Sequence, residues 1–349
     1  MPGIGVSIAQ SEEKFVMLTL TRLRTRLRAV VAVVATCWLL ASNIGAAEPG
    51  LALANAEVGD QKTGSVLVYP LFVSSASSPQ STNTQISITN TNATQTAVIH
   101  LFFVDGSSGA NNDYFLFLTP SQTARFAASD IEPGVRGYLL AVVTNFTGCP
   151  ENFNYLAGEA YVKLGTGQTA NLPATAIAAL TPNPAGCSSG NTTAVLNFNG
   201  VNYNLLPRTL AATKLRSPAD GNASVLAVMR LGGNLATGPA VALGTVAGEL
   251  IDDLGNGVSY THTEAGPQLF MPLSDAFPST TPVLSTVLPS GRTGWLTLAG
   301  NTNAGLFGVL LNFNPSLTAQ PAAYRSGHNL HHLTLATAVS LTIPVFPPQ

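Results

Sequence analysis

Three of the five histidines stand close together near the end of the sequence, at His328, His331 and His332. Imidazole is a common ligand for zinc and copper, so this tract could hold a transition metal, with His262 or an acidic residue completing the shell. Side chains alternate along a strand, so His328 and His332 would share one face while His331 points away. The tract therefore predicts either a metal site of a metal-dependent hydrolase, or a polar approach to the last strand in which each ring is hydrogen-bonded locally.

Two cysteines remain once Cys37, which lies in an N-terminal apolar run, is set aside: Cys149 and Cys187. A pair of cysteines in an exported chain indicates one disulfide, whereas two free thiols would suit a cytosolic protein. Closing a loop of this length would stabilise the fold by ~3–4 kcal/mol in the chain-entropy model. We expect the disulfide.

Other chemical motifs lack an essential part. The segment Gly165–Ala170 matches a dinucleotide-binding pattern, but the next acidic residue is Asp220, far beyond the ~20 positions at which the ribose ligand is expected. The loop Asp105–Asp113 could offer oxygen ligands to calcium, but Leu116 stands where such a loop needs a glutamate. The sequence has no G-x-S-x-G, S-x-x-K or H-E-x-x-H motif. We therefore expect no cofactor and no catalytic residues.

The first 47 residues have the features of a secretory signal peptide. Basic residues at 22–28 precede the apolar run Ala29–Ala41, and small residues follow at Gly45–Ala47. Met17 is the expected start, and the apolar run is shorter than the ~20 residues that cross a bilayer. We expect a chain exported to the periplasm, the cell surface or the medium, with no transmembrane segment after cleavage.

Charge is sparse beyond the signal peptide. Five of the 15 basic residues and two of the 17 acidic residues lie before residue 48, which leaves 10 basic and 15 acidic groups. No basic stripe exists, so nucleic acid is not an expected partner. Asn, Thr, Ser and Gly must supply the solubility, as is common on extracellular β-proteins. The expected partners are extracellular glycans or other surface proteins.

The segment 64–106 sets the secondary-structure pattern. Polar and apolar residues alternate over Gln85–Thr89, and Val98–Val104 is apolar on both faces except at His100. Between these runs, Asn90–Thr96 consists of small and polar residues that favour a turn. The segment therefore predicts an antiparallel hairpin.

Later segments continue this pattern. Asn199-Gly200 and Gly255–Gly257 are each flanked by strand-like runs and predict two further hairpins. The one short helix is expected at Ala174–Leu180, with Pro173 at its start, where a missing N–H costs nothing.

About 300 residues past the signal peptide exceed a comfortable single core, so two domains are expected. The polar run 216–222 marks the boundary between them. Short internal matches, such as Ser65–Leu67 with Ser224–Leu226, occur at inconsistent offsets and argue against an aligned tandem repeat. The expected organisation is a signal peptide at 1–47, a linker at 48–57, a first domain at 58–216, a linker at 217–223 and a second domain at 224–349.

Several segments together resemble a known group of proteins. These are GSVLVYPLF at 64–72, ISITNTN at 86–92, VIHLFFVDG at 98–106 and the terminal run 327–348. They resemble exported bacterial domains of the immunoglobulin-like β-sandwich type, and residues 60–349 are similar to secreted proteins of Acidobacteria and other environmental bacteria. The resemblance implies secretion and a β-sandwich fold, and it supplies no catalytic residues.

The expected fold is thus all-β, with two antiparallel β-sandwich domains of immunoglobulin-like or Greek-key connection and one short helix in the first. The expected function is that of a secreted or cell-surface structural or adhesive protein without catalytic activity. One alternative is a pair of carbohydrate-binding modules, for which Trp295 would supply an aromatic platform. The other is the hydrolase that would use His328, His331 and His332.

Overall fold

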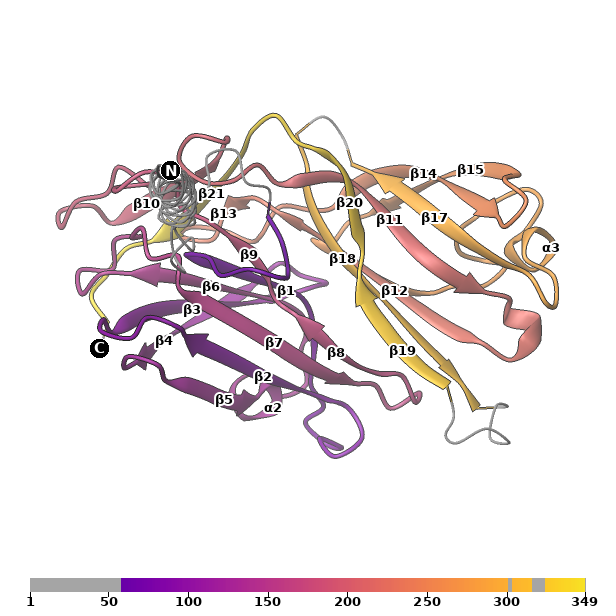
Figure 1. Ribbon diagram of the computed structural model, residues 1–349, viewed down its shortest axis with the longest axis horizontal. Coiled ribbons are helices and arrows are strands. Elements are labelled where there is room, and N and C mark those ends of the chain that lie inside the picture. The colour runs from indigo at the N-terminus through magenta and orange to yellow at the C-terminus, as the bar shows by residue number, and fades with distance from the viewer. Residues whose placement is uncertain (1–57, 301–302, 316–323, 349) are drawn as a thin grey trace, which may run out of the picture. The chain divides into compact units, whose positions relative to one another are not determined.

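The computed structural model describes residues 58–300, 303–315 and 324–348, and the strands of these residues form five sheets (Figure 1). The expected signal peptide and the linker at 48–57 lie outside the described residues. Sheet 1 has, in pairing order, β4 (Asn111–Leu118), β3 (Ala97–Asp105), β6 (Arg136–Thr144), β1 (Val66–Val73) and β9 (Thr175–Ile177). Sheet 2 has β5 (Thr123–Ala127), β2 (Asn83–Asn90), β7 (Leu156–Lys163) and β8 (Thr169–Pro173).

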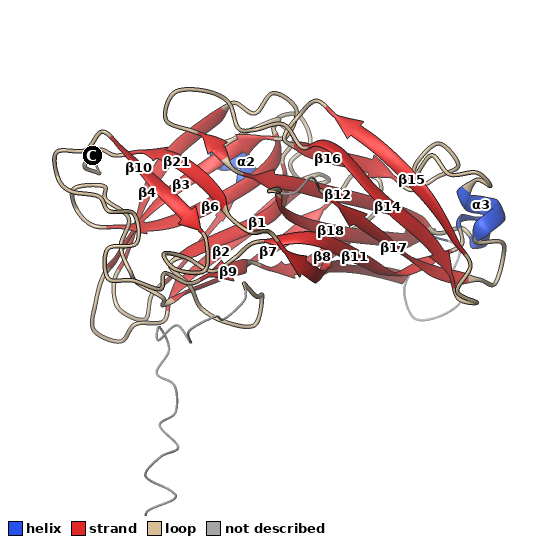
Figure 2. Ribbon diagram, turned by 90° about the horizontal axis from the view of Figure 1, so that it is seen from above, coloured by secondary structure: helices blue, strands red, loops and turns tan. Residues whose placement is uncertain are grey.

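The remaining sheets belong mostly to the C-terminal half. Sheet 3 has β15 (Gly257–Glu264), β14 (Gly244–Asp252), β17 (Thr293–Ala299), β11 (Pro207–Arg216) and β20 (His331–Leu335). Sheet 4 has β16 (Gln268–Pro272), β12 (Ala223–Leu231), β18 (Gly305–Asn314) and β19 (Tyr324–Asn329). Sheet 5 has β10 (Thr193–Phe198), β21 (Val339–Pro344) and β13 (Gly233–Asn234). The helices of the described residues are single turns, α2 (Ala128–Ile131) and α3 (Leu284–Val287), both blue in Figure 2, and the 3-10 turn η1 (Pro218–Asp220).

Three clusters of buried apolar side chains hold the sheets together. The first lies between sheets 1 and 2, the second between sheets 1 and 5, and the third between sheets 3 and 4. Sheet 1 is therefore covered on both faces, which explains why every residue of β1 is buried. Strand β14 in sheet 3 instead alternates between buried and exposed positions, because only one of its faces is covered.

The expectation of two immunoglobulin-like β-sandwich domains is wrong. The described strands form five sheets, and residues 49–349 cluster as one compact unit. The first apolar cluster includes Val225 and Leu311 from the C-terminal half, so the two halves share part of their core. Strand β21, at the end of the chain, pairs with β10 from the N-terminal half and with β13. The all-β class itself is confirmed.

The strand order of sheets 1 and 2 recurs in sheets 3 and 4. In sequence order, β1 to β9 correspond to β11, β12 and β14 to β20, and each strand has corresponding neighbours in its sheet. The single-turn helices α2 and α3 also correspond, because each lies between the fifth and sixth strands of its copy. The chain therefore contains two copies of one nine-strand arrangement.

Details of the backbone support this correspondence. Strand β1 has a register shift between Tyr69 and Phe72 against β6, and β11 has one between Ala212 and Leu215 against β17. Just after these shifts, Ser74 donates its N–H to the Val135 carbonyl at 2.9 Å, as Ser217 does to Arg292 at 3.3 Å. The interpretation of the sequence as lacking an aligned repeat is therefore corrected by the structure.

Two local expectations fail because distant strands compete for the same segment. Gln85–Thr89 and Val98–Val104 are strands but not a hairpin, since β2 pairs with β5 and β7 while β3 pairs with β4 and β6. The run after Asn199-Gly200 forms no strand partner for β10, which pairs with β21. The hairpin at Gly255–Gly257 is confirmed, because it joins β14 to β15.

The helix expected at Ala174–Leu180 is also wrong. Residues Thr175–Ile177 form β9, which pairs with β1 and is an edge strand of sheet 1. Ala176 and Ile177 are fully buried there, so tertiary packing overrides the weak helix preference of this alanine-rich segment. The residues expected as the second linker hold η1 and the start of β12.

Candidate functional site

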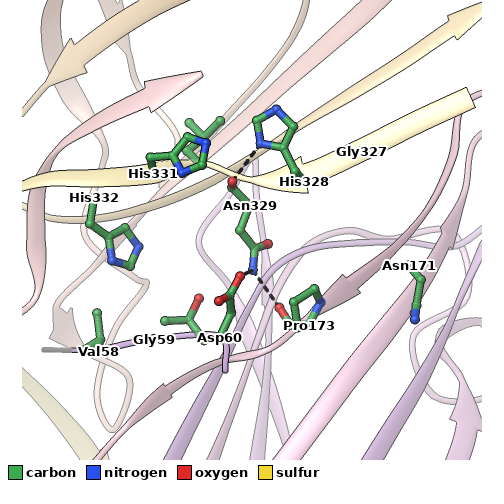
Figure 3. Close-up of a pocket in the computed structure, with 12 residues that line it drawn as sticks. Val58, Gly59, Asp60, Asn171, Pro173, Gly327, His328, Asn329, His331 and His332 are labelled. Carbon is green, nitrogen blue, oxygen red and sulfur yellow. Dashed lines mark hydrogen bonds between the residues drawn. The ribbon is translucent and has the colours of Figure 1, made fainter. Parts of the chain in front are cut away.

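A cleft of about 420 Å³ opens where the two copies of the strand arrangement meet. One wall is the end of β8 together with Thr175, another is the segment Val58–Asp60 that leads to β1, and the third is Gly327–His332 at the junction of β19 and β20 (Figure 3). Strands β8 and β19 lie side by side. Three segments far apart in sequence therefore contribute to one cleft.

Asn329 is the central polar residue of this cleft. Its Nδ2 donates to the Pro173 carbonyl at 2.8 Å and to Asp60 Oδ2 at 3.3 Å, so its amide ties the three walls together (Figure 3). Its Oδ1 is buried and has no hydrogen-bond partner among the described residues. The amide oxygen and the Asp60 carboxylate are both acceptors. The cleft wall therefore holds one buried acceptor without a donor, in the same amide that donates to the Asp60 carboxylate.

His328 is held by the backbone on both sides of its ring. Its Nδ1 lies 2.8 Å from the Asn329 carbonyl and its Nε2 lies 3.3 Å from the Thr213 carbonyl. A neutral imidazole has one N–H and can donate to one of these carbonyls at a time. These contacts orient the ring as part of the cleft wall.

The other two histidines of the tract follow on β20. His331 is exposed, with its Nε2 3.2 Å from Thr213 Oγ1 and its ring 5.7 Å from the His328 ring, centroid to centroid. The His332 ring packs edge-to-face against Phe307 at 6.1 Å. The structure thus brings His328 and His331 together, whereas the His332 ring packs against Phe307 of the second apolar cluster.

His262 lies away from this tract. It is on β15, whereas His331 and His332 are on β20, and these strands are the opposite edges of sheet 3. Four inter-strand spacings of ~4.8 Å separate these edges, or roughly 19 Å. The His262 ring packs against Phe277. His262 therefore cannot complete a metal shell with the other three.

No group of three or more His, Cys, Asp or Glu side chains is placed to hold a metal ion within the described part of the chain. The metal site considered at His328, His331, His332 and His262 consequently has no geometric support as a four-ligand or three-ligand centre. What remains is a pair of neighbouring imidazoles beside an amide and a carboxylate.

The repeated strand arrangement shows which residues of the cleft the fold itself requires. Leu330 donates its N–H to the Gly308 carbonyl, and Ala174 donates its N–H to the Gly158 carbonyl in the same way, so Leu330 and Ala174 occupy equivalent positions. Counting from this pair, His328, His331 and His332 correspond to Leu172, Thr175 and Ala176. The first copy forms the same strands with aliphatic and hydroxyl side chains at these positions. The imidazoles are therefore not needed to form the strands.

The expected disulfide is confirmed and lies elsewhere. Cys149 and Cys187 are bonded, with 5.6 Å between their Cα atoms. Cys149 is buried at the edge of the second apolar cluster, and the bond anchors the loop before β10 to the loop after β6. It contributes no residue to the cleft.

Sequence reasoning singled out the histidines but missed Asp60 and Asn329. Asn329 lies inside the histidine tract. The only feature of the sequence that could have marked it as a site residue was a polar side chain at the junction of two strands. Asp60 is 269 positions away from Asn329, and nothing in its local sequence marks it. Only the fold brings these two residues together.

Comparisons with known proteins add little to this geometry. No protein-family model matches the sequence, and no curated protein matches it. Among solved structures, a lectin from Pleurotus ostreatus in complex with GalNAc aligns with 82% of this chain and 91% of its own, at 12% identity and a TM-score of 0.18. A TM-score this low carries no argument about fold or function. Over the described residues, no helix combines the length and apolar character needed to span a membrane.

Proposed function

We propose that this protein is an exported, non-catalytic adhesive protein that binds a saccharide in the cleft formed by β8, β19, β20 and the segment Val58–Asp60. Export rests on the features of residues 1–47 in the sequence. Binding rests on the donor and acceptor pattern of the cleft. The absence of catalysis is part of the proposal and is tested together with binding.

The unpartnered Oδ1 of Asn329 is the observation that carries the proposal. A buried acceptor without a donor costs about 1–3 kcal/mol, so a ligand that supplies an O–H or N–H there recovers this free energy. The adjacent Asp60 carboxylate accepts a second donor, and hydrogen bonds to a charged acceptor are the stronger kind. Neighbouring hydroxyls on a sugar ring provide two donors.

The rest of the lining suits the apolar side of a sugar ring. Val58, Pro173 and Leu330 provide aliphatic surface, and His331 provides an exposed aromatic ring beside it. Small-molecule sites commonly combine such apolar surface with a few polar groups that fix the orientation of the ligand. A hydroxyl-rich, uncharged ligand matches this combination.

Titration with soluble oligosaccharides, followed by calorimetry and by NMR of the histidine ring protons, tests the proposal. Asp60→Asn keeps the shape of the side chain and an acceptor for the Asn329 amide, but removes the charge. We expect it to bind roughly tenfold more weakly, as for the loss of a charge-assisted hydrogen bond. Asn329→Leu should abolish binding.

The matched control is Asn152→Ala, which removes an exposed amide outside the cleft. Its affinity should equal that of the unmodified protein. The proposal is overturned if Asp60→Asn and Asn329→Leu, with unchanged circular dichroism, bind every oligosaccharide in a broad panel as the unmodified protein does, or if no member of the panel binds. Release of shortened oligosaccharide during the titration would overturn its non-catalytic part.

A further inference from the structure

We infer that the exposed face of sheet 3 extends the cleft into a platform for a linear, uncharged polysaccharide, with Trp295 as its aromatic contact. This inference rests on the proposed function, because it places further sugar units of the same ligand beside the cleft. We call this surface the sheet 3 platform and define it by Thr209, Thr213, Trp295, Thr297, His331 and Thr334.

The repeated strand arrangement shows that this face is left open in the second copy only. Trp295 and Thr297 of β17 correspond to Tyr138 and Leu140 of β6, by the shared register of these strands with their neighbours. Tyr138 and Leu140 are buried under sheet 5, with 1% and 0% of their surfaces exposed. In the second copy no described strand takes the place of sheet 5, and the equivalent residues are half-exposed.

The side chains on this face differ between the two copies, as their exposure does. Where the first copy has the buried Val66, the second has Thr209, whose Oγ1 accepts a hydrogen bond from Thr334 at 2.6 Å. The wider face carries a second threonine pair, Thr245 and Thr263, with 2.9 Å between their hydroxyls. These hydroxyls are uncharged and can each accept or donate further hydrogen bonds. These hydroxyls therefore suit a neutral, hydroxyl-rich partner.

The sheet 3 platform is continuous with the cleft through Thr213. Its Oγ1 lies 3.2 Å from His331 Nε2, and its carbonyl lies 3.3 Å from His328 Nε2. Thr213 and Lys214 form the irregular part of β11, across from Trp295 on the neighbouring β17. One residue therefore links the aromatic contact on the platform to both imidazoles of the cleft.

The spacing suits a chain of sugars rather than a single one. Trp295 on β17 and His331 on β20 are separated by β11 alone, so two strand spacings, or roughly 10 Å, lie between their strands. An extended glycan of a few units covers that distance. Trp295, the only tryptophan among the described residues, offers a large flat apolar surface with one N–H donor, which is the combination that sugar faces require.

The experiment compares short and long ligands on the full chain. Binding to hydroxyethylcellulose, xylan, glucomannan and laminarin is measured by affinity gel electrophoresis, and binding of the tetrasaccharides of the same linkages is measured by calorimetry. Trp295→Ala should weaken polymer binding roughly tenfold and leave tetrasaccharide affinity within a factor of about two. Trp295→Phe should restore most of the polymer affinity.

The control is Tyr161→Ala, which removes an exposed aromatic side chain from β7 in sheet 2. It should leave both affinities unchanged. Equal polymer binding by Trp295→Ala and by the unmodified protein overturns the platform, whereas unchanged tetrasaccharide binding by Asp60→Asn overturns the cleft. Loss of both affinities in Trp295→Ala would also overturn the platform as a separate extension, and failure of all four polymers to retard the protein overturns the inference outright.

Discussion

Ala174 and Leu330 occupy the same position in the two copies of the strand arrangement, and each donates its N–H to a glycine carbonyl at 2.8 Å, that of Gly158 or of Gly308. In both copies this residue is the single step between the last strand of a four-stranded sheet and an edge strand of a five-stranded sheet. The cleft lies beside both steps. The repeat thus determines where the cleft lies. Its polar side chains are not repeated, because each wall of the cleft belongs to one copy only.

Gly158 and Gly308, whose carbonyls accept these two hydrogen bonds, should not tolerate replacement by alanine. A Cβ added at Gly158 would lie 1.9 Å from Tyr69 Oη, which donates to the Ser87 carbonyl, and one at Gly308 would lie 2.7 Å from the Ala227 carbonyl. We expect Gly158→Ala and Gly308→Ala each to lower the free energy of unfolding by about 1–3 kcal/mol, the usual cost of overpacking. Urea denaturation measures this. Gly190→Ala, with open space around it, should be neutral, and a neutral result for Gly158→Ala would contradict the close approach.

The disulfide should stabilise the folded state substantially. The Cys149–Cys187 bond closes a sequence separation of 38 residues, for which the chain-entropy model gives ~4 kcal/mol. Adding a reductant during urea denaturation should therefore shift the midpoint to a lower concentration. The double variant Cys149→Ser with Cys187→Ser should show the lower midpoint without reductant and no further change with it. Equal midpoints in all conditions would show that the bond does not constrain the unfolded chain.

Acid should destabilise the protein partly through Asp105. Burial raises the pKa of this carboxyl, but hydrogen bonds from Ser107 and Ser108 outweigh burial and hold the pKa below its ordinary value. A carboxyl with a depressed folded-state pKa stabilises the fold above its unfolded pKa of ~3.9, and that contribution is lost as the pH falls through the folded-state pKa. Asp105→Asn should thus be less stable at neutral pH and show a shallower loss below pH ~4. Val201→Ala, at an exposed site that carries no titratable group, should keep the original slope.

Local signals in the sequence predicted the elements that depend on local chemistry. The all-β class, the hairpin at Gly255–Gly257 and the cysteine pair follow from alternation, turn residues and cysteine count. The helix expected at Ala174–Leu180 failed because Thr175–Ile177 is recruited as an edge strand by β1, a partner more than one hundred residues earlier. No local pattern reports such recruitment.

The repeat and the cleft depend on information that a single sequence does not display. Equivalent positions such as Ser74 and Ser217, or Gly158 and Gly308, are separated by different numbers of residues, because the connecting loops differ in length between the copies. The short match of Ser65–Leu67 with Ser224–Leu226 joins strands that do not correspond, since β1 corresponds to β11 and not to β12. Matching letters were therefore a poor guide to matching structure.

The last strand should make the two halves of the chain unfold together. Leu341 in β21 is 1% exposed and packs in the second apolar cluster, which also holds residues of β1, β3 and β6 from the N-terminal half and Phe307 from β18. Leu341→Ala removes buried apolar volume from this shared cluster and should cost about 2–5 kcal/mol. If the halves form one cooperative unit, the loss appears equally in the fluorescence of Trp295 in sheet 3 and in the hydrogen exchange of β3 amides in sheet 1. Val201→Ala, at a 63% exposed site in the loop after β10, should move neither signal. A loss confined to the β3 amides would mean that the halves unfold separately, since the shared cluster would then fail to couple them.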